Sequence, residues 1–447
     1  MINFKNIGKH SYAWDILMPF YRFALSDVFF KECVIVGREN IPPAGTPVFV
    51  IANHQNSIND ALQIVSMFKD YRQPVALARG DFFKNDTVAK ILRFWRVMPT
   101  YRSKDGGTSD IKKNMETFQI ASGILKNGGV IVMFPEAMHQ QRRILGTFKK
   151  GVPRICFGAE EVADFQLNLQ ILPVNLHYSK VQKFREKALI EIGKPFGISE
   201  LLETYKKNPN EAYLQFNDKA RTIFKKMVLD IEDVENYEEC NFLREMIRYE
   251  RIKNNYKNYN YYDEFKEEKK VIAEIDALKE KTPEKFETLM ATTKTYSESL
   301  KKLNFKNWLV NHKITGFGLI MKTLLMVILS PFFLFGFVNN VIPCFLVNFL
   351  TNKIPDRVFV GSLRFIMGFL LMPLWYICIC VAASLISHSF IIGMAYTLLA
   401  FLSLFVFYRY RIITFKLWHT WRYFFVRKTE EIVHIKEFKN RILEYFK

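Results

Sequence analysis

Two long stretches without charged residues constrain the fold of this chain more than any other feature. Thr323–Asn352 carries no charge over 30 residues, and Phe365–Tyr408 carries none over 44 residues apart from the titratable His388. A helix that crosses a membrane needs about 20 apolar residues. The second stretch is therefore long enough for two helices, which we expect to turn near residues 387–389.

The first stretch is too long for one straight span and too short for two. Gly336, Asn339–Asn340 and Pro343 lie near its middle, so we expect a re-entrant or interfacial hairpin that turns there, with one long kinked helix as the alternative. Basic residues precede the first stretch, separate the two and follow the second. If each stretch returns to the side on which it began, all these cations are cytoplasmic, as the positive-inside rule requires. We predict an integral membrane protein whose remaining part faces the cytoplasm.

The sequence predicts five parts along the chain. They are an amphipathic N-terminal helix (1–33), an α/β domain (34–200), a charged helical extension (201–312), membrane hairpins (313–411) and a basic, aromatic interfacial tail (412–447). The apolar residues of the first part recur at spacings of three and four, so this helix either docks on the core or lies in the membrane interface. Charged residues interrupt them, and we expect no signal peptide.

The charge balance limits the possible partners. The 63 lysines and arginines exceed the 44 acidic residues, which gives a net charge of +19. Nucleic acid, an anionic membrane surface and an acidic substrate could each balance such a charge. No zinc-finger or RNA-recognition pattern occurs, and the basic residues gather beside apolar segments. This pattern favours a membrane surface and predicts no nucleic-acid partner. The six cysteines have no metal-like spacing, so we expect neither a metal site nor a disulfide framework.

Residues 34–200 alternate strand-like and helix-like segments, which predicts a sheet flanked by helices. The expected strands are short apolar runs at Val48–Ala52, Val75–Ala78, Val130–Phe134, Ile171–Leu176 and Leu189–Ile192. The clearest helix covers Asp110–Lys126 and ends at a glycine pair. Such a glycine pair is typical of a helix C-terminus.

A histidine follows the first expected strand. His54 stands two residues after Ala52, and Asp60 lies six residues further on. A histidine at a strand end can be a satisfied structural residue. It can also be a general base whose tautomer and orientation are held by a carboxylate.

Four further blocks follow in a fixed order. Val97–Arg102 places a cation after an apolar segment, and Val130–Glu136 ends a strand on a carboxylate. Phe148–Gly151 supplies two lysines, and Ile171–Val174 opens a strand that contains a proline. With the histidine block, the set resembles the glycerolipid acyltransferase family, which includes glycerol-3-phosphate and lysophosphatidic acid acyltransferases. Four blocks match that family: the histidine block, the arginine block, the Phe-Pro-Glu block and the proline-bearing strand. The resemblance covers about residues 35–200 and implies an α/β acyltransferase domain.

The chain departs from the family pattern at two positions. The family usually has four residues between the histidine and the aspartate, whereas five separate His54 from Asp60, and Asn59 occupies the usual aspartate position. One extra residue turns a helical side chain by about 100°. Either the local backbone is looped, so that Asp60 reaches the histidine, or Asn59 orients it. We expect Asp60 to be the orienting residue. Ala137 stands where the family usually has glycine.

The resemblance implies acyl transfer to an alcohol. No cysteine or serine lies in a nucleophile setting such as Gly-x-Ser-x-Gly, so we expect direct transfer without a covalent acyl-enzyme. His54 would take the hydroxyl proton, and Asp60 would orient it and stabilise the imidazolium. The implied acceptor-binding residues are Arg102, Glu136, Lys149, Lys150 and Gly151. The cations would bind phosphate, and the glutamate would contact glycerol hydroxyls or position an arginine. The alternatives are a solvated basic loop for the lysines and a structural partner of Arg102 for the glutamate.

The expected reaction moves a fatty acyl group from an acyl thioester to 1-acyl-glycerol-3-phosphate and gives phosphatidic acid. The donor would be acyl-CoA or acyl carrier protein, the other partner would be membrane lipid, and we expect no cofactor. Other acceptors are glycerol-3-phosphate, another lysolipid or an aminolipid. A catalytically inactive membrane scaffold is the alternative outside the enzyme class. The sequence leaves the oligomeric state open.

Overall fold

The chain divides into two compact units. The computed structural model describes residues 4–68, 72–101, 107–136, 142–312 and 314–447, with the backbone alone for residues 107–113 and 256. The first unit comprises Met1–Asp230 and Asp356–Phe365, and the second comprises Ile231–Pro355 and Ile366–Lys447. A short segment between two apolar helices thus belongs to the first unit.

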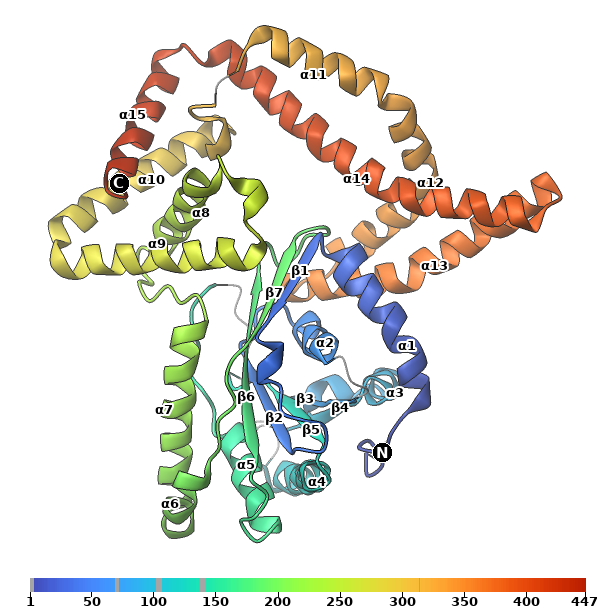
Figure 1. Cartoon of the computed structure of the whole chain (residues 1–447), viewed down its shortest axis with the longest axis vertical. Coiled ribbons are helices and arrows are strands. Elements are labelled where there is room, and N and C mark those ends of the chain that lie inside the picture. The colour runs from blue at the N-terminus through green and yellow to red at the C-terminus, as the bar shows by residue number, and fades with distance from the viewer. Residues whose placement is uncertain (1–3, 69–71, 102–106, 137–141, 313) are drawn as a thin grey trace. The chain divides into compact units, whose positions relative to one another are not determined.

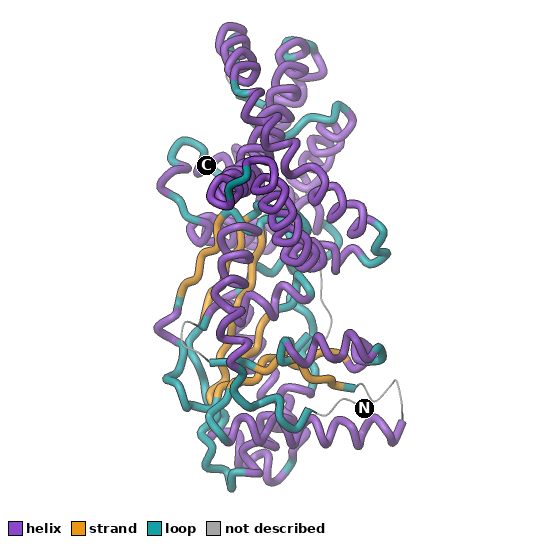
Figure 2. Tube along the Cα trace, turned by 90° about the vertical axis from the view of Figure 1, so that its right-hand side faces the viewer, coloured by secondary structure: helices purple, strands orange, loops and turns teal. Residues whose placement is uncertain are grey.

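A mixed seven-stranded sheet forms the centre of the first unit (Figures 1 and 2). Its strands are β1 (Glu32–Val36), β2 (Val48–Ala52), β3 (Val75–Arg79), β4 (Val97–Thr100), β5 (Val130–Met133), β6 (Gln170–Tyr178) and β7 (Lys187–Ile192). They lie in the order β1-β7-β6-β2-β5-β3-β4. All neighbouring strands are parallel except β6 and β7, which are antiparallel. Strand β2 is therefore the central strand.

The sheet confirms the predicted α/β fold. All five residues of β2 are buried, as expected for a parallel strand that is covered on both faces. The five expected strands correspond to β2, β3, β5, β6 and β7. The sequence analysis missed β1 and β4, which lie at the two edges of the sheet. Strand β1 is only half-buried, and β4 contains Pro99, a residue that sheets tolerate at their edges.

Seven α-helices surround the sheet in the described part of the first unit. They are α1 (Tyr12–Phe23), α2 (Ile58–Met67), α3 (Asp86–Phe94), α4 (Gly107–Lys126), α5 (Gly151–Val162), α6 (Leu202–Lys207) and α7 (Pro209–Met227). Helix α7 places Phe216, Ala220 and Phe224 in the same apolar core as Phe49 of β2. The compact unit extends to Asp230, and the domain boundary expected at residue 200 stays a prediction.

Helix α1 has two apolar faces. Trp14, Met18 and Tyr21 are buried, and the Trp14 ring contacts Trp95 edge-on. On the other side, Tyr12 and Ile16 are 80% and 72% exposed. The helix therefore docks on the core, as one prediction held. The exposed apolar face is also typical of a helix that contacts a membrane interface, so the second prediction stays open.

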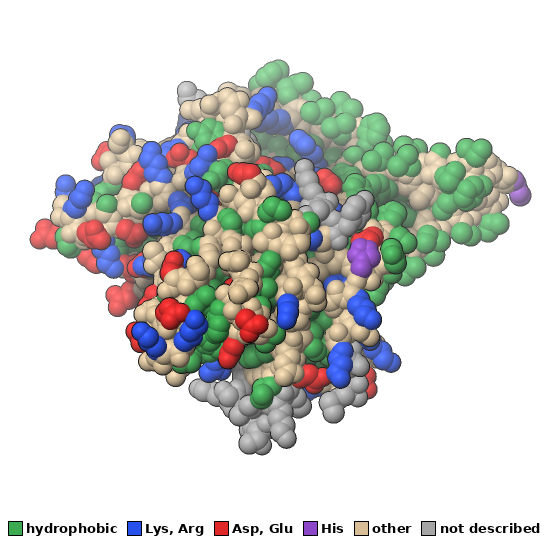
Figure 3. Space-filling view, turned by 60° about the horizontal axis from the view of Figure 1, so that its bottom comes forward, with side chains coloured by type: hydrophobic (Ala, Val, Ile, Leu, Met, Phe, Trp, Pro, Cys, Tyr) green, Lys and Arg blue, Asp and Glu red, His purple; other side chains and the backbone are tan. Residues whose placement is uncertain are grey.

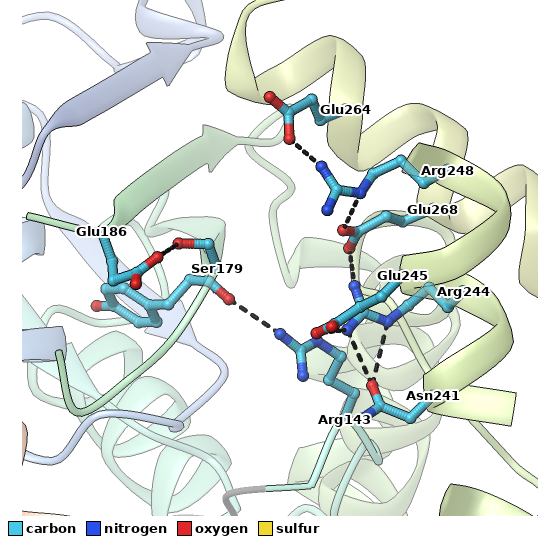
Figure 4. A network of polar contacts seen from close by, with 10 residues as sticks. Arg143, Ser179, Glu186, Asn241, Arg244, Glu245, Arg248, Glu264 and Glu268 are labelled. Atoms are coloured by element: carbon cyan, nitrogen blue, oxygen red, sulfur yellow. Dashed lines mark hydrogen bonds and ion pairs between the residues drawn. The ribbon is translucent and has the colours of Figure 1, made fainter. Parts of the chain in front are cut away.

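The charged part of the second unit is a set of helices joined by buried ion pairs (Figure 4). It contains α8 (Tyr237–Ile252), α9 (Tyr261–Lys281), α10 (Pro283–Lys302) and α15 (Glu430–Glu444). Arg244 and Arg248 of α8 both pair with Glu268 of α9, and Arg248 also pairs with Glu264. Helix α15 packs against α10, and its Lys439 Nζ lies 2.7 Å from Glu250 of α8. These contacts fold residues 430–444 back onto the extension.

The apolar stretches form four helices: α11 (Gly316–Ile328), α12 (Ser330–Asn352), α13 (Val360–Ser387) and α14 (Phe390–Val426). Within the described residues, three helical segments are long and apolar enough to cross a membrane: Ser330–Asn352, Arg357–Ser387 and Phe390–Val426. Apolar side chains cover the arm that α13 and α14 form in Figure 3. The expected turn at residues 387–389 is present.

The turn expected in the first stretch is not where the sequence placed it. Helix α12 continues through Gly336 and Pro343, and the chain bends instead at Leu329, between α11 and α12. Asn339 and Asn340 bond to neighbouring helices and do not break their own. Helix α14 likewise continues to Val426, so no break marks the expected start of the tail at residue 412.

Candidate active site

The carboxyl end of β2 carries the first residues of the site. The Asn53 side chain donates to the Leu176 carbonyl at 2.9 Å and accepts from the Leu176 N–H at 2.7 Å. The amide thus imitates a strand residue and prolongs the pairing of β2 with β6. This pair of bonds fixes the backbone just before His54.

Asp60 holds His54 through the nitrogen Nδ1. The distance from Nδ1 to Asp60 Oδ2 is 2.9 Å, and the aspartate is fully buried. The same oxygen accepts backbone N–H bonds from Gln55 at 2.8 Å and Asn56 at 2.7 Å. Asp60 also lies in the first turn of α2, where the helix dipole favours a negative charge. Asp60 Oδ2 therefore accepts two backbone N–H bonds and lies where it can accept a hydrogen bond from His54 Nδ1.

The structure shows which of the two residues, Asn59 or Asp60, contacts His54. The side-chain amide of Asn59 makes no hydrogen bond within the described residues. Residues 55–57 form a loop before α2, and Ser57 has a φ of 49°. The additional residue is absorbed in this loop, so Asp60 reaches His54 although a regular helix would have turned it away.

Phe134, directly after β5, and Tyr178, at the end of β6, support the pair. The Phe134 ring stacks on the His54 imidazole, with 4.1 Å between centroids and 16° between planes. The Tyr178 hydroxyl donates to Asp60 Oδ1 at 2.7 Å. Arg143 donates to the Tyr178 carbonyl at 3.0 Å (Figure 4). The sequence analysis missed Tyr178 because it lies 118 residues from Asp60 and no local pattern marks it.

Glu136 lies at the same edge of the sheet and is also buried. Burial, and then the negative charge of Asp60, raise the pKa of Glu136 to about 8. The Gly146 N–H and the Arg221 guanidinium act in the opposite direction. The carboxyl is therefore mostly protonated at pH 7, where it can donate a hydrogen bond as well as accept one.

A small cavity joins these groups. Its lining consists of Asn53, His54, Gln55, Glu136, Arg142, Ile144, Leu145, Val228 and Leu229. Arg142 is a cation that the sequence analysis did not select, although it follows the Phe-Pro-Glu block by only a few residues. The site thus combines an imidazole, a neutral carboxyl and a guanidinium.

The other predicted residues lie elsewhere or outside the described part. Arg102 is outside the described residues. Lys149 donates its backbone N–H to the Pro135 carbonyl at 2.8 Å, and its side chain is exposed. Lys150 Nζ lies 3.3 Å from Asn210 Oδ1, and Gly151 starts α5. The structure brings together His54, Asp60 and Glu136, while substrate binding by the lysines and Gly151 stays a prediction.

The first unit thus combines a mixed sheet, a His-Asp pair after its central strand and a Phe-Pro-Glu segment after the neighbouring strand. Residues 32–177 match the Acyltransferase family. The match lies within the first unit and agrees with the motif resemblance.

Two curated relatives are similar to parts of this chain. Glycerol-3-phosphate O-acyltransferase 2 of Saccharomyces cerevisiae is 35% identical over 99 residues, which are 22% of this chain and 13% of that protein. The chloroplastic 1-acyl-sn-glycerol-3-phosphate acyltransferase LPAT1 of Arabidopsis thaliana is 28% identical over 123 residues, 27% of this chain and 32% of that protein. The similarity thus spans less than a third of either relative.

One solved structure is also similar. The 1-acyl-sn-glycerophosphate (LPA) acyltransferase from Thermotoga maritima aligns with a TM-score of 0.32 and 17% identity. The alignment covers 50% of this chain and 77% of that one.

Proposed function

We propose that this chain is a membrane-bound O-acyltransferase that moves a fatty acyl group from an acyl thioester to the free hydroxyl of 1-acyl-glycerol-3-phosphate. The 2.9 Å contact between His54 Nδ1 and Asp60 Oδ2 carries the proposal. A buried carboxyl oxygen that accepts a hydrogen bond from Nδ1–H leaves the basic lone pair on Nε2. This is the tautomer that a general base requires.

The reaction then proceeds by direct transfer. His54 Nε2 takes the acceptor hydroxyl proton while the hydroxyl oxygen attacks the thioester carbonyl carbon. The tetrahedral intermediate collapses, the carbon–sulfur bond breaks, and the leaving thiolate receives the proton from the imidazolium. Asp60 stabilises the imidazolium between these two steps. The Phe134 ring keeps the imidazole plane fixed throughout.

The acceptor phosphate would lie near Arg142. A guanidinium binds phosphate through parallel N–H donors, and Arg142 lines the same cavity as His54. Glu136, protonated at neutral pH, would donate to a phosphate oxygen or a glycerol hydroxyl without repelling the dianion. Arg102, Lys149 and Lys150 remain candidates for further positive charge.

Glycerol-3-phosphate is the second candidate acceptor. It is favoured by the similarity to the yeast protein whose name specifies glycerol-3-phosphate acylation. The two acceptors share the phosphate and differ in the acyl chain, so the same His54 chemistry would serve either one.

The test is acyl transfer by the purified full chain in detergent. Labelled acyl-CoA is offered with each acceptor in turn, and products are separated by chromatography. We expect His54→Ala to lower kcat by about 10²- to 10⁴-fold, because it removes the general base. Asp60→Asn should also lower kcat strongly, because an amide no longer enforces the productive tautomer.

Asn59→Ala is the matched control, since it alters the neighbouring side chain, which does not contact His54. It should retain near wild-type kcat. Full activity of His54→Ala would overturn the proposed mechanism. Absence of product from the wild type with both acceptors, and also with acyl carrier protein as donor, would overturn the proposed function.

A further inference from the structure

Residues 356–365, here called the connector, link the apolar helices α12 and α13 but belong to the first unit. The connector contains a short 3₁₀ helix (Arg357–Phe359) and the first residues of α13. Val360, Ser362 and Phe365 are buried. A segment that lies between two long apolar helices is thus part of the core of the first unit.

Ser362 contacts the loop that carries the candidate catalytic pair. Its hydroxyl oxygen accepts the backbone N–H of Asn59 at 3.0 Å. The hydroxyl also donates to the carbonyl of Asn56 at 2.8 Å. One fully buried side chain therefore joins both ends of the turn that precedes Asp60. The Asn56 N–H is itself one of the donors to Asp60.

The neighbouring residue allows this close approach. A Cβ added to Gly361 would lie 2.4 Å from the Val181 carbonyl oxygen and 2.8 Å from Asn56 Oδ1. Real Cβ atoms do not approach other atoms so closely. The glycine is therefore required for the connector backbone to lie against the loop.

Further contacts secure both ends of the connector. Arg364 donates to the Gln182 carbonyl at 2.7 Å, and Gln182 Nε2 donates to the Arg357 carbonyl at 3.0 Å. The Phe365 ring packs edge-on against Tyr21 and Phe29. These contacts hold the connector in one position, so the Ser362 hydroxyl is presented to the loop by a fixed backbone.

We propose that Ser362 is a positioning residue for catalysis and that the connector couples the start of helix α13 to the His54–Asp60 pair. This role rests on the proposed function. The loop at residues 55–57 contains a strained backbone conformation at Ser57, and such a conformation persists only where its surroundings over-determine it. Ser362 supplies that support. Displacement of the connector would loosen the carboxylate and lower the rate of acyl transfer.

The test compares Ser362→Ala with Ser387→Ala in the full chain. Ser387 lies at the other end of α13, and within the described residues its hydroxyl bonds to the carbonyls of Ala383 and Ser389 in the same helix and turn. We expect Ser362→Ala to lower kcat by about 10- to 100-fold, the size of effect that a small misplacement of catalytic groups produces. The KM for both substrates should change less than kcat. Ser387→Ala should retain wild-type kcat, and Ser362→Thr should recover activity because it restores the hydroxyl.

Amide hydrogen exchange gives a readout that needs no substrate. Ser362→Ala should speed exchange in peptides that cover residues 53–60, because the Asn59 N–H loses one of its two acceptors and keeps only the Asn56 carbonyl. Gly361→Ala should do the same by displacing the connector. Unchanged exchange in this loop in both variants would overturn the proposal, as would unchanged kcat in Ser362→Ala. If the wild type transfers no acyl group, the proposed function fails while the exchange result still decides whether the connector holds the loop.

Discussion

At the residue scale, the site depends on two buried carboxyl groups in different surroundings. Asp60 accepts two backbone N–H bonds and the Tyr178 hydroxyl, and its Oδ2 lies 2.9 Å from His54 Nδ1. Burial, and then the negative charge of Asp60, raise the pKa of Glu136 to about 8. A carboxyl group with a raised pKa beside a histidine is typical of acid–base sites.

We expect Glu136→Gln to change the pH dependence of stability. The unfolded chain loses the Glu136 proton near pH 4.5, whereas the folded chain keeps it to about pH 8. Between these values the folded state binds more protons, so the wild type loses stability as pH rises. The loss amounts to about 1.4 kcal/mol per pH unit for full titration of one group. The neutral amide has no such loss.

Thermal unfolding of both proteins in detergent, from pH 4 to pH 9, measures the difference. As pH rises from about 4.5 to about 8, the Tm of the variant should increase relative to that of the wild type. Below about pH 4.5 the difference in Tm between the two proteins should stay constant. A difference in Tm that is constant across the whole range would contradict the raised pKa of Glu136.

At the element scale, two asparagines join the apolar helices. Asn340 Nδ2 donates to the Gly336 carbonyl at 2.8 Å and to Ser403 Oγ of α14 at 3.1 Å. The Tyr376 hydroxyl of α13 donates to Asn340 Oδ1 at 2.6 Å. The Trp375 indole N–H donates a hydrogen bond to the backbone carbonyl of Asn339 at 2.7 Å. Polar side chains inside apolar helices therefore connect α12, α13 and α14, as interhelical hydrogen bonds do in membranes.

Asn340→Ala should loosen this three-helix contact. It removes the bonds to Ser403 and Tyr376 and leaves a void, which we expect to cost about 1 to 2 kcal/mol. The measurement is thermal unfolding in detergent micelles. Asn348→Ala is the matched control, because Asn348 lies exposed on the same helix and bonds to the Cys344 carbonyl of its own helix. Equal losses in the two variants would contradict the role assigned to Asn340.

At the scale of the whole molecule, chain connectivity limits the membrane topology. The connector belongs to the same unit as residues 1–230. Between them, the described residues 231–315 contain no helix that could cross a membrane. We therefore expect the chain to cross the membrane an even number of times between residues 316 and 355. The bond between Lys439 and Glu250 likewise places α15 on the same side as α8.

We therefore expect α11 and α12 to enter the membrane and return, and α13 and α14 to form a transmembrane hairpin. This arrangement keeps all the juxtamembrane cations on the side of the acyltransferase unit. The positive-inside rule then assigns that side to the cytoplasm.

Cysteine labelling in sealed vesicles tests this topology. Lys207→Cys in the first unit and Lys353→Cys after α12 should react with an impermeant maleimide from the same side. Ser389→Cys, between α13 and α14, should react from the opposite side. Labelling of the unsubstituted chain corrects for the six native cysteines. Reaction of residues 207 and 353 from opposite sides would show that α12 crosses the membrane once.

The sequence alone determined the features that depend on local pattern. Apolar runs predicted five strands, uncharged stretches predicted the apolar helices, and ordered blocks predicted the acyltransferase domain. Each of these arises from interactions between near neighbours, or from burial that a run of apolar residues already requires.

Only the tertiary structure decided the features that depend on distant contacts. Spacing could not choose between Asn59 and Asp60, because the choice depends on a loop conformation that Ser362 supports from about 300 residues away. Tyr178, Arg142 and the edge strands β1 and β4 carry no sufficient local signal. Asn339 and Asn340 suggested a turn in the sequence, but their hydrogen bonds to α13 and α14 make a continuous helix the more stable arrangement.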